Sequence, residues 1–190
     1  MKKVTFHNLD SIDELASPDN IDNINLDSPA TKIFTDFKYS KPLIIESSLL
    51  AIDAEKLMQK AHVRLKFILN HNNHFLGIVS LDSLSKQNML KEIAKGTATM
   101  DELKVTDFMS PREKIRAIDY SDIINLSIKD VLHALQENKE QHCLILETEK
   151  HRIRGIISAS DIARKLHIPI NIESDSSFIE VYKFIKEKKS

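Results

Sequence analysis

The sequence has very little glycine and cysteine and no tryptophan. Three glycines and one cysteine occur among its 190 residues. Loops in which the backbone closely approaches a phosphate need glycine, and the phosphate-binding loop, the dinucleotide fingerprint and the nucleophile elbow are all missing. Cys143 alone cannot form an intramolecular disulfide, which is consistent with a reducing compartment. P-loop nucleotidases, dinucleotide-dependent enzymes, α/β-hydrolases and disulfide-stabilised secreted proteins are therefore disfavoured.

An excess of charge and long apolar runs are also missing. The formal net charge is −1, so no basic field exists to hold a nucleic-acid backbone. No run approaches the ~18 apolar residues of a membrane span. Asn8, Asp10 and Asp13 interrupt the region where a signal peptide would be apolar. We expect a cytoplasmic protein that binds neither membrane nor nucleic acid.

An internal repeat is the most informative feature that is present. Gly77 opens the phrase Gly-Ile-Val-Ser-Leu-Asp-Ser-Leu, and Gly155 opens Gly-Ile-Ile-Ser-Ala-Ser-Asp-Ile. Two β-branched residues after a glycine suit a buried strand, and Ser-x-x-Asp suits the first turn of a helix. The repeat predicts two similar modules packed together, with the function at the corner between strand and helix.

The two predicted repeats show the same order of elements: strand, helix, hairpin and second helix. Each repeat opens with Thr-Asp-Phe, at 35–37 and at 106–108. The predicted strands are 42–45, 65–69 and 76–79 in the first repeat and 115–118, 143–146 and 153–157 in the second. The predicted helices are 50–61, 83–95, 128–135 and 161–167, with Gly96 and Pro169 as stop signals.

The two ends of the chain differ from this pattern. Residues 1–30 are predicted to form a polar, acidic and mostly irregular arm, because residues 4–31 contain six acidic side chains and no Lys or Arg. The first repeat is assigned to 31–96, the second to 97–168 and a terminal extension to 169–190. A Ser-x-x-Glu box at Ser177 predicts that an amphipathic helix follows in this extension.

This order of elements, occurring twice, resembles the cystathionine-β-synthase (CBS) domain, and the tandem pair resembles a Bateman module. The resemblance covers roughly residues 31–168. Its most specific marks are Val105-Thr-Asp-Phe-Met-Ser110 and the Gly155–Ile162 phrase. It implies an α/β (α+β) fold in which two βαββα repeats pack as a pseudo-two-fold pair, and a homodimer.

The resemblance also implies that an adenosine-containing ligand binds in the cleft between the repeats, near Gly155. Asp161 would accept hydrogen bonds from the ribose hydroxyls. Ser158 and the following backbone N–H groups would hold a phosphate, and Arg164 would face the same anion. The alternative is that Ser158-x-x-Asp161 only caps a helix and that Arg164 is a solvated helix residue.

Two apolar residues complete the predicted site. Ile156 and Met109 would provide the flat surface that a purine needs, although Met109 also fits a core position. No catalytic cofactor is expected; the candidate ligands are AMP, ADP, ATP and S-adenosylmethionine.

The first repeat departs from the motif. Aligning the glycines places Ser80 opposite Ser158 but Ser83 opposite Asp161. Asp82 is displaced by one residue, which rotates its side chain by about 100° on a helix. We therefore predict one good ligand site per chain, in the second repeat.

Other candidate chemistry has simpler explanations. His142 and Cys143 are adjacent on a predicted strand, so their side chains point to opposite faces and cannot form a nucleophile-base pair. Cys143 is predicted to be a core residue. His62, His71 and His74 have a loose metal-like spacing, but polarity at a hairpin tip also explains the last two.

These observations predict a non-enzymatic regulatory module that senses an adenosine-containing ligand. The alternative is a dimeric scaffold that binds no small molecule and engages an unknown protein partner through the arm and the terminal helix. An enzyme that uses Cys143 or the histidines is the third and least supported hypothesis.

Overall fold

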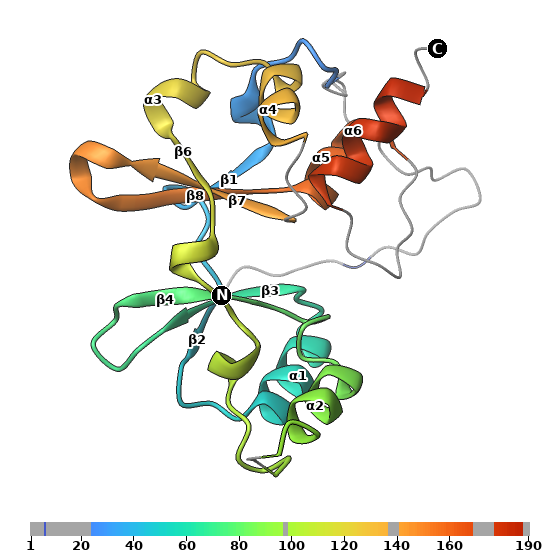
Figure 1. Ribbon diagram of the computed structural model, residues 1–190. Coiled ribbons are helices and arrows are strands. Elements are labelled where there is room, and N and C mark those ends of the chain that lie inside the picture. Colours follow the sequence, from blue (N-terminus) through green and yellow to red (C-terminus); the bar gives the residue numbers. More distant parts are fainter. Residues whose placement is uncertain (1–5, 7–23, 97–98, 137–140, 169–176, 188–190) are drawn as a thin grey trace.

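The computed structural model describes residues 6, 24–96, 99–136, 141–168 and 177–187. Two four-stranded sheets face each other across the middle of the molecule, and the long helices lie on the two outer sides (Figure 1). Each sheet with its helices forms one half of the molecule. The predicted α+β fold of two paired repeats is confirmed.

The first half has a sheet in the order β2-β3-β4-β5. β2 and β3 are parallel, and the other neighbours are antiparallel. Two helices, α1 and α2, cover the outer face of this sheet (Figure 1). The bounds are β2 Ile44–Glu46, α1 Ala51–Lys60, β3 Leu65–Leu69, β4 Phe75–Ser80, α2 Lys86–Ile93 and β5 Ser110–Pro111.

The second half repeats this arrangement in the order β6-β7-β8-β1. β6 and β7 are the parallel pair. The bounds are β1 Phe34–Asp36, β6 Ala117–Asp119, α3 Tyr120–Ile123, α4 Ile128–Leu135, β7 His142–Glu147, β8 Arg152–Ser158, α5 Ala159–Lys165 and α6 Phe178–Glu187. Short 3-10 turns, Ala30–Lys32, Val105–Phe108, Arg112–Lys114 and Thr148–Lys150, complete the described elements.

The two halves exchange one strand each. β1 lies at the start of the first repeat in the sequence but pairs with β8 of the second half. β5 lies in the segment predicted to start the second repeat but pairs with β4 of the first half. In register, Thr35 lies opposite Ile156 and Ser110 lies opposite Ile78. Thr35 therefore corresponds to Ser110, and the predicted equivalence of the two Thr-Asp-Phe segments is wrong by four residues. Backbone pairing therefore aligns the two repeats through Thr35 and Ser110.

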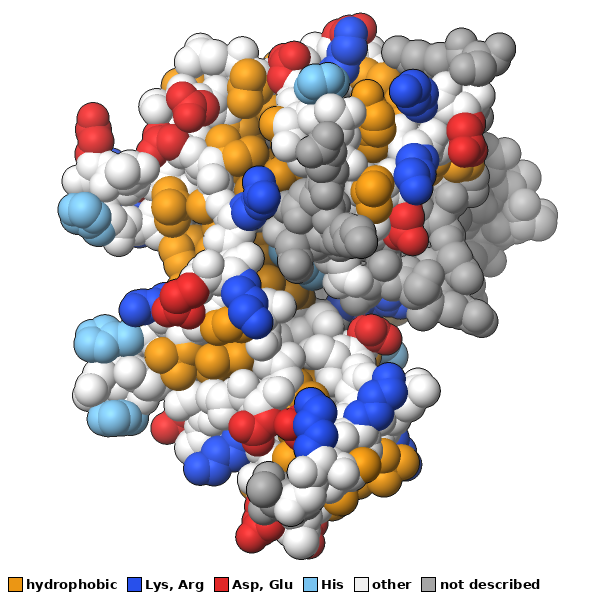
Figure 2. All heavy atoms as spheres, viewed as in Figure 1, with side chains coloured by type: hydrophobic (Ala, Val, Ile, Leu, Met, Phe, Trp, Pro, Cys, Tyr) orange, Lys and Arg blue, Asp and Glu red, His pale blue; other side chains and the backbone are white. Residues whose placement is uncertain are grey.

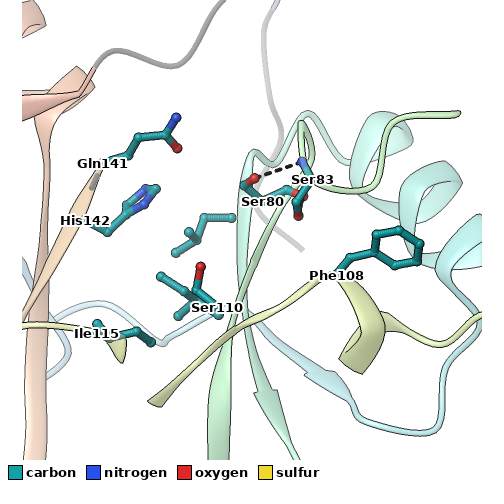
Figure 3. A pocket seen from close by; sticks show the side chains of 9 residues that line it. Ser80, Ser83, Phe108, Ser110, Ile115, Gln141 and His142 are labelled. Atoms are coloured by element: carbon teal, nitrogen blue, oxygen red, sulfur yellow. Dashed lines mark hydrogen bonds between the residues drawn. The ribbon is translucent and has the colours of Figure 1, made fainter. Parts of the chain in front are cut away.

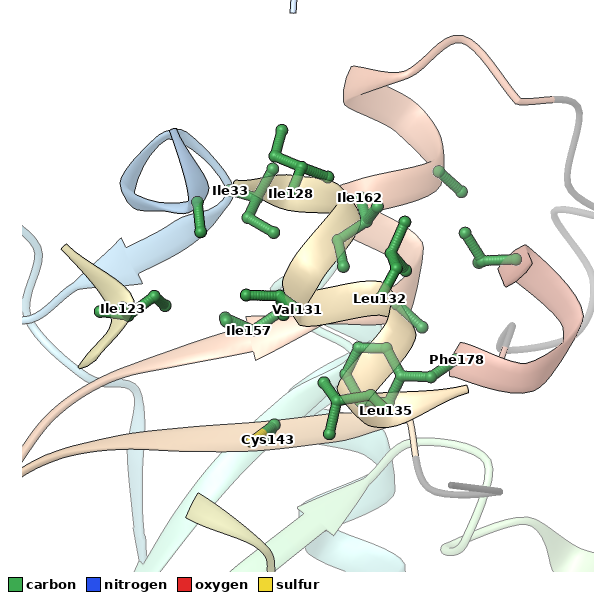
Figure 4. Close-up of a cluster of buried hydrophobic side chains, with 14 of the residues drawn as sticks. Ile33, Ile123, Ile128, Val131, Leu132, Leu135, Cys143, Ile157, Ile162 and Phe178 are labelled. Atoms are coloured by element: carbon green, nitrogen blue, oxygen red, sulfur yellow. The ribbon is translucent and has the colours of Figure 1, made fainter. Parts of the chain in front are cut away.

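Three clusters of buried apolar side chains hold the fold together. One lies under α1 and α2 in the first half, and a second lies under α4, α5 and α6 in the second half (Figure 4). The third joins the two sheets and contains Phe67, Ile78, Leu144 and Ile156. Successive strand residues point to opposite faces, so Ile68 belongs to the helix-side cluster while Phe67 belongs to the cluster between the sheets.

The helix that follows each repeated phrase starts at a different place from the prediction. α5 begins at Ala159, two residues early, directly after Ser158. α2 begins only at Lys86, because Ser83 Oγ donates to Ser80 O at 2.7 Å and holds a turn ahead of the helix. Gly96 follows α2 with φ +100°, as expected of a glycine after a helix.

The predicted terminal helix is confirmed as α6. Its apolar side packs on the second half, with Phe178 and Val181 fully buried and Ile185 partly buried. Ser177 N donates to Glu180 Oε2 at 2.8 Å, one of the two hydrogen bonds of the predicted box. Most of the predicted acidic arm, 1–5 and 7–23, lies outside the described residues, as does 169–176.

Candidate ligand site at the strand-to-helix corners

The second corner, Ser158 to Asp161, joins β8 directly to α5. Ser158 Oγ accepts a hydrogen bond from Asp161 N at 3.4 Å, so the serine caps the helix, although the bond is long. The cap uses the backbone of Asp161 and leaves its carboxylate free for other partners. The predicted cap and the predicted ligand residue are thus compatible in the same short segment.

The carboxylate of Asp161 forms an ion pair with the guanidinium of Arg164 one turn later. The Asp161 side chain is 28% exposed and that of Arg164 is 74% exposed. Lys165 follows, and its ammonium donates to the carbonyl of Lys32. Arg164 is therefore the cation that lies beside Asp161, whereas the ammonium of Lys165 is held at the Lys32 carbonyl.

Ile156 and Gly155 have structural roles that the sequence did not reveal. Ile156 is 7% exposed and packs in the cluster between the sheets. A Cβ added to Gly155 would lie 2.4 Å from the carbonyl oxygen of Thr35 and 2.8 Å from the ring of Phe34. Gly155 therefore lets β1 pair closely with β8 within one sheet, whereas Ile156 packs between the two sheets.

The structure does not bring Met109 together with Asp161. Met109 packs against the core of the first half, whereas α5 packs in the core of the second. The cause is the strand exchange, because the segment before β5 belongs to the first half. In register, Phe34 occupies the position beside β8 that Met109 has beside β4.

The first corner, Ser80 to Ser83, borders a cavity of about 60 Å³. Figure 3 shows Ser80 and Ser83 facing Gln141 and His142, which come from the second half, with Ser110 below them. Ser83 N donates to Ser80 Oγ at 3.1 Å. Sites for drug-sized ligands have volumes of roughly 300–1,000 Å³. In this conformation the cavity holds a few water molecules at most.

The other candidate chemistry finds little support in the described residues. Cys143 is fully buried, as predicted, and burial raises the pKa of its thiol to about 12, so it stays protonated and unreactive. Within 24–96, 99–136, 141–168 and 177–187, no His, Cys, Asp or Glu side chains form a metal-binding group. No helix in the described part of the chain has the length and apolar character of a membrane span.

Sequence reasoning missed a buried ionic cluster around Arg154. Its guanidinium donates to both carboxylate oxygens of Asp36, at 2.6 and 2.7 Å, and to Glu147 Oε1 at 2.6 Å. It also lies 4.4 Å from the centre of the Tyr120 ring. The hydrogen bonds from Arg154 hold the pKa of Asp36 below its ordinary value. The cluster fastens the exchanged strand β1 to the second half.

Comparisons with known proteins agree with this fold. A family model for the CBS domain matches residues 35–88 and 105–168. No curated protein matches the chain. Among solved structures, an uncharacterized conserved protein from Pyrococcus horikoshii shares 19% identity, with a TM-score of 0.53 over 78% of this chain and 98% of that one.

Two further structures show the same likeness. The conserved CBS domain protein TA0289 from Thermoplasma acidophilum, of unknown function, is 18% identical, with a TM-score of 0.51 over 80% of this chain and 77% of its own. The CBS domain of the bacterial CNNM/CorC family Mg²⁺ transporter in complex with ATP is 14% identical, with a TM-score of 0.51 over 76% and 91%. At these identities the likeness shows the fold.

Proposed function

The chain belongs to the CBS-domain family, and from this we propose that it is a regulatory, non-catalytic module that binds an adenosine-containing ligand. CBS-domain pairs commonly serve as ligand-binding regulatory units. The ligand site is the second corner, where Asp161 receives the ribose and Arg164 faces a phosphate. Ligand binding would shift the packing of the two halves by its different affinity for two arrangements.

The accessible carboxylate of Asp161 is the observation that carries this proposal. A carboxylate can accept a hydrogen bond from each of two adjacent ribose hydroxyls. Its present partner, Arg164, lies one turn away on the same helix and is largely exposed. Exposed pairs of this kind contribute only about 0.3–0.5 kcal/mol, so a ribose can compete for the carboxylate at little cost.

The charge at the corner favours a ligand that carries phosphate. A ribose that takes the carboxylate of Asp161 would release Arg164 from its ion pair. AMP, ADP or ATP would then gain a cationic partner for phosphate, where the cationic S-adenosylmethionine would lose. The ATP complex of a CNNM/CorC CBS domain is consistent with this ligand class. We expect one site per chain, because Ser83 replaces the aspartate at the first corner and the cavity there is only about 60 Å³.

Isothermal titration calorimetry with AMP, ADP, ATP and S-adenosylmethionine tests the proposal. Asp161→Ala should weaken binding about tenfold or more, because two hydrogen bonds to a charged group are lost. Asp82→Ala, which removes an exposed acid at the first corner, is the matched control and should bind normally. Unchanged affinity in Asp161→Ala, or two equivalent sites per chain, would contradict the assignment.

A protein-interaction scaffold remains the second candidate function. The small cavity at the first corner and the serine in place of aspartate favour it. A thermal-shift screen separates the two functions, since a ligand at 100 times its dissociation constant adds ~2.7 kcal/mol to stability. No shift with any adenosyl compound would favour the scaffold. In either role we propose a homodimer and, from the single buried cysteine, a cytoplasmic protein.

A further inference from the structure

An apolar groove runs along α6 on the outer side of the second half, where this helix packs across α4 and α5 (Figure 1). Its larger part has a volume of about 460 Å³, which lies within the range of ligand-binding clefts. A smaller part has about 170 Å³ and shares Leu26 and Ile185 with the first, so the two parts adjoin. The other apolar side chains of the groove are Ile24, Leu132, Leu166, Ile168, Tyr182 and Phe184. The groove is therefore large and apolar enough to receive a further segment of chain.

The last part of the N-terminal arm forms one wall of this groove, because residues 24–27 line it. Two backbone hydrogen bonds fix that wall to the first turn of α4. Ile128 N donates to Ser28 O at 2.9 Å, and Lys129 N donates to Leu26 O at 2.8 Å. The first amides of a helix have no partner within it, so the arm caps α4. The preceding residues of the chain therefore join the described structure at the groove itself.

The charged side chains of the groove are mostly basic. Lys129 of α4 and Lys186 of α6 line its smaller part and are exposed. Asp27 is the one acid among the described residues that line either part. Figure 2 shows apolar and basic side chains beside one another over α4 and α6. A segment that combines apolar with acidic side chains is complementary to such a surface.

The arm upstream of Ile24 has this composition. Residues 7–23 lie outside the described part of the chain. Their sequence contains five acidic side chains and no Lys or Arg, with Ile12, Leu15 and Ile21 between the acids. The arm thus carries the charge that the groove lacks, together with the apolar side chains that the groove can bury.

The arm is also long enough to reach along the groove. α6 has 10 residues and is about 15 Å long. An extended residue spans at most about 3.6 Å, so roughly five residues are enough to lie along the helix. The residues directly before Ile24 are Asp19-Asn-Ile-Asp-Asn23, which hold one isoleucine between two aspartates. These residues can therefore enter the groove without any intervening loop.

We propose that the acidic arm of the same chain occupies the groove. Ile21 packs on the apolar walls, and the carboxylates of Asp19 and Asp22 lie at the two lysines of the groove. A segment joined directly to Ile24 has a high effective concentration at this site, so it outcompetes a free peptide of the same sequence. The arm thereby covers the side of α6 that faces away from the core. The contact does not depend on any ligand at the strand-to-helix corners.

Hydrogen exchange of the full chain, followed by mass spectrometry, tests the contact. The amides of residues 19–23 should exchange several-fold more slowly than in a synthetic peptide of residues 1–23. Lys129→Glu combined with Lys186→Glu should remove most of this protection, because the acids of the arm are then repelled. The amides of α6 serve as an internal check in the same data, and their protection should persist because both lysines are exposed.

Lys60→Glu combined with Lys91→Glu is the matched control. Both lysines are exposed on helices of the first half, so the net charge changes equally while the groove is untouched. The arm should keep its protection in this variant. Loss of protection in the control as well would show that net charge, and not the groove, holds the arm, and would overturn the proposal.

A charge exchange tests the site directly. Asp19→Lys and Asp22→Lys, added to the variant with Lys129→Glu and Lys186→Glu, should restore protection of the arm, because the two sides then exchange signs. Each arm variant is compared with a peptide of its own sequence. Failure of this restoration would overturn the proposal, as would a wild-type arm that exchanges as fast as the peptide. Protection that rises with protein concentration would place the arm of a second copy in the groove and would also overturn the intramolecular contact.

Discussion

The two halves share one fold and the same strand exchange, but they hold the exchanged strand differently. In the second half, Arg154 binds Asp36 and Glu147 and ties β1 in place. The first half has Leu76 at the position before its glycine, and β5 contains only Ser110 and Pro111. One exchanged strand is therefore held by buried charge, whereas the other is held by a minimal backbone ladder and apolar packing.

The two strand-to-helix corners also differ between the halves. At the second corner the helix starts at once and presents an accessible carboxylate on its first turn. At the first corner a serine turn delays the helix and borders a cavity of about 60 Å³. Both corners have the glycine and the capping serine, whereas the aspartate of the second corner is replaced by Ser83 at the first.

Removing Arg154 should give the largest effect on stability. Arg154→Met removes the guanidinium partner of the Asp36 carboxylate, although the Asp36 side chain is only 14% exposed. Glu147 keeps Arg152 and Lys150 as partners. Breaking a buried pair costs about 3 kcal/mol or more. For a chain of this size that is roughly 6–12 °C in Tm. Urea unfolding and calorimetry measure both quantities.

Arg152→Met provides the control for this comparison. Arg152 also pairs with Glu147, but its side chain is 58% exposed, so its loss should cost well under 1 kcal/mol. Equal losses of stability in the two variants would show that burial of Arg154 does not reinforce the second half.

The two repeated glycines should give the next largest effect. A Cβ at Gly155 would meet the carbonyl oxygen of Thr35 at 2.4 Å, and one at Gly77 would meet that of Ser110 at 2.3 Å. Each Gly→Ala change should cost about 1–3 kcal/mol by forcing the exchanged strand away. The loss should be greater at Gly155, because β1 is fixed by Arg154 while the two-residue β5 can shift.

Chemical denaturation of the single variants ranks these losses, with Gly96→Ala as a reference. Gly96 has open space around its Cβ position but φ +100°, so only its backbone is strained by alanine. A smaller loss of stability for Gly155→Ala than for Gly77→Ala would mean that β1 is not held more rigidly than β5.

Local patterns predicted most of the fold. The helix predicted over 128–135 is α4, with the same bounds. The structure shows a capping box at its start, with hydrogen bonds from Asp130 N to Ser127 Oγ and from Ser127 N to Asp130 Oδ2. The repeated glycine phrase predicted a strand in each half. These signals are local, because caps and alternating apolar residues depend on neighbours within one or two turns.

The strand exchange and its consequences were beyond local reasoning. β5 is too short to be seen as a strand, and its pairing with β4 is decided by contacts between distant segments. For this reason Met109 was placed at the wrong corner. The charge of Arg154 between apolar residues of a strand was the available signal for a buried partner, but only the fold shows that the partner is Asp36.

The smallest expected effect is the pH dependence of stability, which tests the ionic cluster around Arg154 with the variants already described. Hydrogen bonds from Arg154 lower the pKa of Asp36 in the folded state. This contribution to stability is present above the ordinary pKa of about 3.8 and is lost as the pH falls through the lowered value. The stability difference between wild type and Arg154→Met should therefore narrow as the pH falls from about 7 to about 3.

The control is Gly77→Ala, which involves no titrating group. Its stability difference from wild type should stay constant. Urea unfolding at the two pH values gives both differences, and a gap for Arg154→Met that does not change with pH would mean that packing, and not charge, holds β1.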